Sequence, residues 1–137
     1  MFEICTSITA PSKGLEKVDQ VLDAGFRFFV DNPAYVTLMR REAIDGGSHL
    51  AIDLAATMRP LFDEAVSYFE REMAAGVFRD QDAAQLLLTG YGALLSYFSD
   101  VPFLEGLLDE DPLTDAALAR RRAHIIEFFR SALGDPS

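Results

Sequence analysis

Side chains that could carry out catalysis or bind a metal ion are few and scattered in this sequence of 137 residues. The chain has two histidines, His49 and His124, and a single cysteine, Cys5. His124 and Glu127 would share one helical face, but two ligands make a poor metal site. The sequence contains no His-Glu-x-x-His pattern, no cysteine pair and no glycine-rich phosphate loop. We therefore expect no metal, no cofactor, and histidines that lie on an ordinary surface or interface.

The residues that could act as nucleophiles belong to no recognisable catalytic motif. Cys5 has no adjacent base in the sequence, and His49 beside Ser48 belongs to no recognisable catalytic motif, whereas nucleophilic catalysis needs both a partner base and an orienting group. The acidic run from Asp109 to Asp111 lacks the spacing of a calcium-binding loop. Three consecutive arginines at 120–122 are more typical of a solvated helix face or of salt-bridge partners than of a nucleic-acid site. The sequence therefore does not predict an enzyme.

Aromatic and methionine side chains are the stronger candidates, and they indicate binding. Methionine adapts to varied shapes, and a tyrosine hydroxyl at an apolar site can orient a ligand. Tyr35 and Tyr91 are the best single polar contacts for a small hydrophobic molecule. The whole candidate set consists of Phe26, Phe29, Tyr35, Met39, Met58, Phe62, Tyr91, Leu95 and Phe98. Each of these residues could instead belong to the core.

The composition limits the partners of the chain. Its formal net charge of −10, from 12 basic and 22 acidic residues, repels nucleic-acid phosphates and anionic membrane surfaces. Half of the residues are hydrophobic, which is enough for the core of one domain. A single cysteine fits a reducing cytoplasm, and we find neither a signal peptide nor an apolar run of about 18 residues. We expect a soluble, cytoplasmic protein without direct nucleic-acid or membrane binding.

The elements that must position the aromatic set are all helical. Apolar residues at helical spacing predict five helices, over residues 15–31, 33–44, 49–75, 80–99 and 115–133. Pro33 separates the first two, and Pro60 should kink the third. Asp80 is the expected cap of the fourth helix, and Thr114 or Asp115 that of the fifth. Between the last two helices, Phe103 and its apolar neighbours could form a helical turn that covers the core.

The predicted helix over residues 80–99 is apolar most of the way round, so it should be buried on most sides. Its two apolar stripes indicate two partners, the core of its own chain and a second copy; which stripe faces which partner stays open. Gly90 and Gly92 each cost roughly 1 kcal/mol relative to alanine inside a helix, which the close approach of a partner helix or a ligand would offset.

Three stretches, taken together in order, resemble the C-terminal ligand-binding and dimerisation domain of the tetracycline-repressor (TetR) family of bacterial regulators. The stretches are FRFFVDNPAYVTLMRREA (26–43), EREMAAGVFRDQDA (70–83) and QLLLTGYGALLSYF (85–98). The first stretch is similar to a helix, a proline and a short helix of the family. The second is similar to the end of its long helix, where a glycine leads into an aspartate cap. The third is similar to its apolar central helix. The resemblance covers roughly residues 14–134.

The resemblance implies an all-α domain of five to six helices that dimerises through a four-helix bundle, two helices coming from each chain. We expect the central and final helices to form this homodimer interface, with Leu87, Gly90, Leu94, Leu118, Ile125 and Phe128 in it. The resemblance also implies a regulator whose small hydrophobic effector shifts the helices and changes the spacing of two attached DNA-binding domains.

Members of the family begin with a basic three-helix DNA-binding domain, which residues 1–13 cannot supply. We interpret residues 1–13 as an N-terminal arm or linker and residues 14–137 as the effector-binding and dimerisation domain. The chain is then either an excised domain or a natural protein without its DNA-binding domain. Two alternatives remain, a stand-alone carrier of hydrophobic ligands or protein-interaction module, and a small all-α enzyme.

Overall fold

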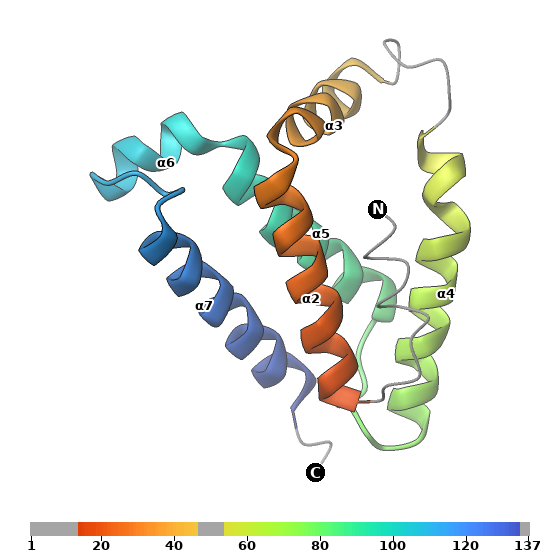
Figure 1. Cartoon of the computed structure of the whole chain (residues 1–137). Coiled ribbons are helices and arrows are strands. Elements are labelled where there is room, and N and C mark those ends of the chain that lie inside the picture. Colours follow the sequence, from red (N-terminus) through yellow and green to blue (C-terminus); the bar gives the residue numbers. More distant parts are fainter. Residues whose placement is uncertain (1–13, 47–53, 135–137) are drawn as a thin grey trace.

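The computed structural model describes residues 14–46 and 54–134, and these form six helices and no strand. The helices are α2 (Gly14–Asp31), α3 (Pro33–Asp45), α4 (Leu54–Ala74), α5 (Ala83–Ser99), α6 (Val101–Leu108) and α7 (Asp115–Leu133) (Figure 1). The predicted all-α class with five to six helices is confirmed. Over the described ranges, no helix combines the length and apolarity that a membrane crossing requires.

The boundary between α2 and α3 lies where the sequence predicts it. Asn32 precedes Pro33, and a residue before proline avoids the helical region, so α2 ends at Asp31. The side-chain amide of Asn32 donates a 2.8 Å hydrogen bond to the carbonyl oxygen of Phe28, which satisfies part of the open end of α2. At the other end of α3, Gly46 has a φ of 69°, a left-handed conformation that glycine adopts without strain.

Helix α4 continues through Pro60 without a break. The predicted first residues of this helix, 49–53, lie outside the described residues. Gly76 has a φ of 78° and ends the helix region as predicted, and the amide of Val77 donates to the carbonyl oxygen of Glu72 at 2.9 Å.

The predicted cap of α5 at Asp80 is wrong, because the helix begins only at Ala83. The side chain of Asp82 accepts the capping bond, at 3.1 Å, from the amide of Gln85. The preceding residues bind to the end of α7 instead. The amide of Arg79 donates to Leu133 at 2.8 Å, and the side chain of Gln81 donates to the carbonyl oxygen of Ala132 at 2.9 Å. These bonds keep the connection extended until residue 82.

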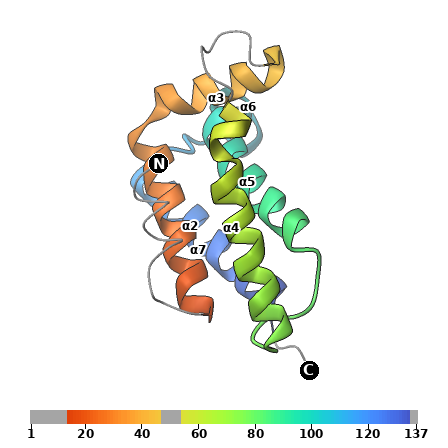
Figure 2. The same cartoon turned by 90° about the vertical axis from the view of Figure 1, so that its right-hand side faces the viewer.

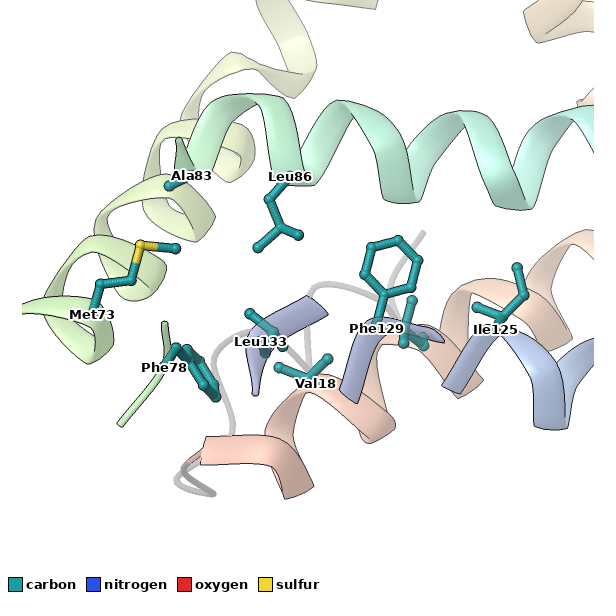
Figure 3. Close-up of a cluster of buried hydrophobic side chains, with 9 residues drawn as sticks. Val18, Met73, Phe78, Ala83, Leu86, Ile125, Phe129 and Leu133 are labelled. Carbon is teal, nitrogen blue, oxygen red and sulfur yellow. The ribbon is translucent and has the colours of Figure 1, made fainter. Parts of the chain in front are cut away.

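The main core joins the four long helices. Figure 3 shows side chains from α2, α4, α5 and α7, together with the connection before α5, pointing into one cluster. Phe78 and Leu133 are the most enclosed members, at 1% and 0% exposed. The buried members are Val18, Leu22, Met73, Phe78, Ala83, Leu86, Ile125, Phe129 and Leu133. A second cluster, of Phe29, Val36 and Leu95, joins α2, α3 and α5.

Helix α5 is the central element, since it contacts α2, α3, α4 and α6, while α7 packs against α2. In Figure 1, α4 and α7 stand on opposite sides of α2, and α2 and α4 diverge from their lower ends upward. Figure 2, turned by 90°, shows α4 along the face that lies at the right-hand side of Figure 1. The helices are therefore joined most closely around the lower half of α4.

Helix α6 does not cover the core, which corrects the prediction for Phe103 and its neighbours. None of its residues is buried, and Phe103 and Leu107 remain 67% and 64% exposed. The helix begins directly after α5, at Val101, and leads the chain to the outer end of the molecule before α7 returns (Figure 1). Its apolar side chains therefore form an exposed surface.

Candidate functional site

Six of the nine predicted binding residues converge where α2, α3 and α5 meet. Phe29, Val36 and Leu95 form the buried centre of this cluster. The converging candidates are Phe26, Phe29, Tyr35, Met39, Leu95 and Phe98. We call this group the aromatic cluster.

The ring of Phe98 connects α5 to α2 within the aromatic cluster. Its centroid lies 5.2 Å from that of Phe26, edge to face, and 5.9 Å from that of Phe29. Such pairs add about 0.5–1.5 kcal/mol beyond the burial of their area. Phe26, Phe29 and Leu95 are buried, so they serve as core, and any ligand would meet them as the floor of its site.

Two tyrosines form the open edge of the aromatic cluster. Tyr35 is half-buried beside the ring of Phe28, at 5.1 Å between centroids, and Tyr91 is 45% exposed. Burial raises the pKa of Tyr35, and the charge of the neighbouring Tyr91 adds to this effect. Because its pKa is raised, the phenol of Tyr35 is a neutral hydrogen-bonding group at physiological pH.

The other two candidates, Met58 and Phe62, lie on α4 and outside the aromatic cluster. Both are half-buried, whereas Ala65 and Met73 further along the same helix are buried. This gradient agrees with the divergence of α2 and α4 in Figure 1. The first half of α4 thus has apolar side chains that the rest of the described chain covers only in part.

A surface hollow of about 390 Å³ lies elsewhere, between the second half of α4 and the start of α5. It contains none of the predicted binding residues, and its lining consists of Val66, Glu70, Met73, Ala74, Asp80, Gln81, Asp82, Ala83 and Ala84. Three carboxylates at its rim make it an unsuitable site for a hydrophobic molecule. Within residues 14–46 and 54–134, no group of acidic, histidine or cysteine side chains could hold a metal ion.

Several predicted dimer residues contact their own chain. A Cβ atom on Gly90 would lie 3.5 Å from the ring of Phe129, so α7 of the same chain approaches this glycine. Ile125 is 4% exposed inside the main core, which leaves it almost no surface for a second copy. Leu94 packs against both core clusters. The side of α5 that carries Gly90 and Leu94 is thus covered largely by helices of the same chain.

The remaining dimer candidates have more free surface. Phe128 is 53% exposed, and Leu87 and Leu118 are half-buried. His124 is exposed one turn before Phe128, and the two ring centroids lie 6.2 Å apart. A Cβ atom on Gly92 would have no neighbour within 4 Å. Gly92 on α5 and Phe128 on α7 are therefore each left with free surface by the described residues.

The three consecutive arginines of α7, at 120–122, act as partners within the chain, as predicted. Arg120 pairs with Glu110, and Arg122 pairs with Asp23 on α2. Arg121 donates to the carbonyl oxygen of Ala93 at 3.1 Å, and burial lowers its pKa. Cys5, Ser48 and His49 lie outside the described residues.

Comparison with known protein families gives one result that spans all six helices. A family model described as "Tetracyclin repressor-like, C-terminal domain" matches residues 15–128, from the start of α2 to the last part of α7. The comparison with curated proteins gives no significant match.

Proposed function

Because this chain belongs to the family of tetracycline repressor-like C-terminal domains, we propose that it is the effector-binding and dimerisation domain of a bacterial transcriptional regulator. The family membership supports a ligand-binding regulatory domain in general. The finer proposal is a cytoplasmic homodimer without enzymatic activity that binds a small hydrophobic effector. Residues 14–137 would form this domain, and residues 1–13 would be the arm that precedes it.

The observation that carries the ligand proposal is the edge of the aromatic cluster. Tyr35 packs against the buried centre of the aromatic cluster, and Tyr91 on α5 is 45% exposed. Leu88, one turn before Tyr91, is 50% exposed on the same helix. A hydrophobic molecule placed between this edge and the half-buried Met58 and Phe62 of α4 would remove apolar surface from water, which stabilises the complex by roughly 25 cal/mol per Å².

A ligand at this place would act on the position of α4. The helix is anchored to the main core through Ala65, Met73 and their neighbours, while its first half is less covered. Pro60 has no amide hydrogen to donate, so the helix is more easily bent there. The effector alters the regulator only if it binds the two positions of α4 with different affinity. The arm at residues 1–13 would transmit the shift to a DNA-binding domain.

The dimer would use the outer surface of α5 and α7. A Cβ atom on Gly92 would meet nothing within 4 Å and Phe128 is 53% exposed, and small residues allow two helix backbones to approach closely. Two helices from each chain would give a four-helix bundle. DNA would be bound only through the separate domain, because a net charge of −10 opposes direct contact with phosphates.

Native mass spectrometry of the purified chain tests both parts of this proposal. We expect a species near twice 15.1 kDa that loses a small neutral or singly charged molecule when it is activated. A monomer at micromolar concentration would contradict the dimer. Failure to take up any of a panel of hydrophobic compounds would contradict the ligand site.

The exposed apolar surface of α6 supports a second candidate, a protein-interaction module. Phe103 and Leu107 are each more than 60% exposed, and contiguous apolar surface often marks a binding site. This reading predicts a monomer that binds another protein through α6. Loss of that binding in Phe103→Ser, with no effect of the same change on effector uptake, would favour it.

A further inference from the structure

Glu42, near the end of α3, is buried, and no described residue pairs with it. It is the one charged side chain that is buried in the described part of the chain, at 5% exposed. Both carboxylate oxygens are shielded from solvent, and neither has a hydrogen-bond partner within residues 14–46 and 54–134. Burial of a carboxylate is unfavourable unless hydrogen-bond donors satisfy it. Such a group therefore either destabilises the fold or is paired by a molecule that binds to the protein.

Glu42 lies on the face of α3 that also carries Tyr35 and Met39 of the candidate ligand site. Leu38 and Met39 precede it by four and three residues, so the three side chains share one face of the helix. Tyr35 lies one further turn back on this face, and both Tyr35 and Met39 pack against the aromatic cluster. Seven residues of α-helix span about 10.5 Å, which is the separation along the axis between Tyr35 and Glu42.

The nearest basic residue with a described partner is directed elsewhere. Arg40 donates to the hydroxyl of Ser99 at 2.9 Å and lies 3.9 Å from the carboxylate of Asp100 on the α5 side. It is two residues from Glu42 and therefore on another face of the helix. Arg41 is exposed. The described chain thus supplies no cation to Glu42.

On the basis of the ligand-binding function proposed above, we infer that Glu42 binds a protonated amine of the effector. The effector would then be a cationic amphiphile whose apolar body, about 10 Å long, contacts the face of α3 between Tyr35 and Glu42. The aromatic cluster by itself specifies no charge on the ligand, whereas Glu42 would select a positively charged one.

The chemistry of the carboxylate favours a cation over other groups. An ammonium group has three donors, and hydrogen bonds between charged groups are about twice as strong as neutral ones. A hydroxyl group has one donor, and an anionic or fully apolar ligand would leave both oxygens unpaired. The net charge of −10 also attracts cations at long range, so a test must separate this general effect from the local one.

Three probes of the same length provide this test: phenylbutylamine as the cation, phenylbutanol as the neutral molecule and phenylbutyrate as the anion. Their affinities for the full chain would be measured by isothermal titration calorimetry. Wild type is compared with Glu42→Gln, which keeps the shape and removes the charge. Glu64→Gln, on the exposed side of α4, is the matched control that changes the net charge equally.

We expect wild type and Glu64→Gln to bind the amine most tightly and the acid least. Glu42→Gln should weaken the amine about 30-fold or more, as loss of one member of a buried charge pair does, and leave the alcohol within about threefold. Binding of the alcohol without a preference for the amine, or a preference that persists in Glu42→Gln, overturns the inference but keeps the proposed ligand site. Absence of binding by all three probes overturns both.

The stability of the ligand-free chain gives a second readout that does not depend on the probes. If Glu42 is kept for a ligand, Glu42→Leu should raise the melting temperature, because it removes an unpaired buried carboxylate from an apolar setting. Glu64→Leu, on the exposed surface, should change it little. A clear drop in the melting temperature of both Glu42→Leu and Glu42→Gln would show that the carboxylate has a structural partner, and it would overturn the inference.

Discussion

The hydroxyl of Tyr97 donates a hydrogen bond of 2.5 Å to the carbonyl oxygen of Pro112, and both residues are buried. Tyr97 belongs to α5, whereas Pro112 lies in the connection between α6 and α7. The guanidinium carbon of Arg121 lies 5.1 Å from the centre of the Tyr97 ring, which adds α7 to the same contact. This bond fixes the point at which the chain returns from the exposed helix α6.

The first prediction is that Tyr97→Phe lowers the free energy of unfolding by about 1–3 kcal/mol. The substitution removes the donor and leaves the carbonyl oxygen of Pro112 buried without a partner, while the ring still fills its place. Urea denaturation followed by circular dichroism measures the change. Tyr91→Phe, at a 45% exposed position, is the control and should stay within about 0.5 kcal/mol of wild type.

The second prediction concerns alkaline pH. Burial raises the pKa of Tyr97 above its usual 10.0, and the nearby charge of Arg121 opposes this only in part. The folded state therefore favours the neutral phenol, so its contribution to stability is complete below pH 10 and is lost as the pH rises through the higher folded value. We expect wild type to lose more stability than Tyr97→Phe when the urea midpoint is compared at neutral pH and above about pH 10. Equal losses in the two proteins would contradict the prediction.

The boundaries that local chemistry determines could be predicted from the sequence. Proline at 33 and glycine at 76 act on their immediate neighbours, and the structure has a helix begin or end there. Of the two caps expected for the last helix, Thr114 and Asp115, the structure uses Thr114. The cap at Asp82 could not be chosen over Asp80 in this way, because the choice depends on hydrogen bonds to the end of α7, about 50 residues away.

The candidate site shows the same division. The aromatic residues of α2, α3 and α5 were found by type and spacing, but their spacing does not show which become floor and which remain open. The sequence does not indicate Glu42 as a site residue, because a glutamate among charged residues at the end of a helix is expected to be exposed to solvent. Only the tertiary packing reveals that it is buried. Likewise, the apolar turn at Phe103 reads as a core element, yet the direction in which α5 ends leaves it in solvent.

The third prediction contrasts the two glycines of α5. A methyl group on Gly92 would meet nothing within 4 Å, so Gly92→Ala should stabilise the isolated chain by about 0.5–1 kcal/mol through helix propensity. At Gly90 a Cβ atom is already in contact with Phe129, so Gly90→Leu must displace this ring and should lower stability. Denaturant midpoints at low protein concentration measure both effects. A Gly90→Leu chain as stable as wild type would show that Phe129 can move aside freely.

The fourth prediction separates the ligand site from the core with two phenylalanines. Phe62 is half-buried on the less covered half of α4. Phe62→Ala should therefore have a strong effect on the affinity for a hydrophobic probe and only a small effect on the melting temperature. Phe78 is 1% exposed in the main core, and Phe78→Ala should cost about 3–5 kcal/mol of stability. Calorimetric titration with phenylbutanol and thermal unfolding are measured on both variants. If Phe62→Ala lowers the melting temperature strongly and leaves affinity unchanged, Phe62 is a core residue.

The fifth prediction places the dimer on the outer surface of α5 and α7. Phe128 is 53% exposed in the single chain and lies beside His124, so Phe128→Glu should leave the fold of one chain intact. In a dimer the same carboxylate would be buried against a second copy without a donor, which weakens association by several kcal/mol. We therefore expect a dissociation constant at least about 30-fold higher by sedimentation equilibrium, with an unchanged circular dichroism spectrum.

Phe103→Glu on α6 is the matched control for this prediction, since it adds the same charge at a residue that is 67% exposed and outside the proposed interface. It should dimerise as wild type does. Dissociation of Phe103→Glu together with an intact Phe128→Glu dimer would move the interface from α7 to α6. The exposed apolar side chains of α6 would then be the surface that a second copy covers.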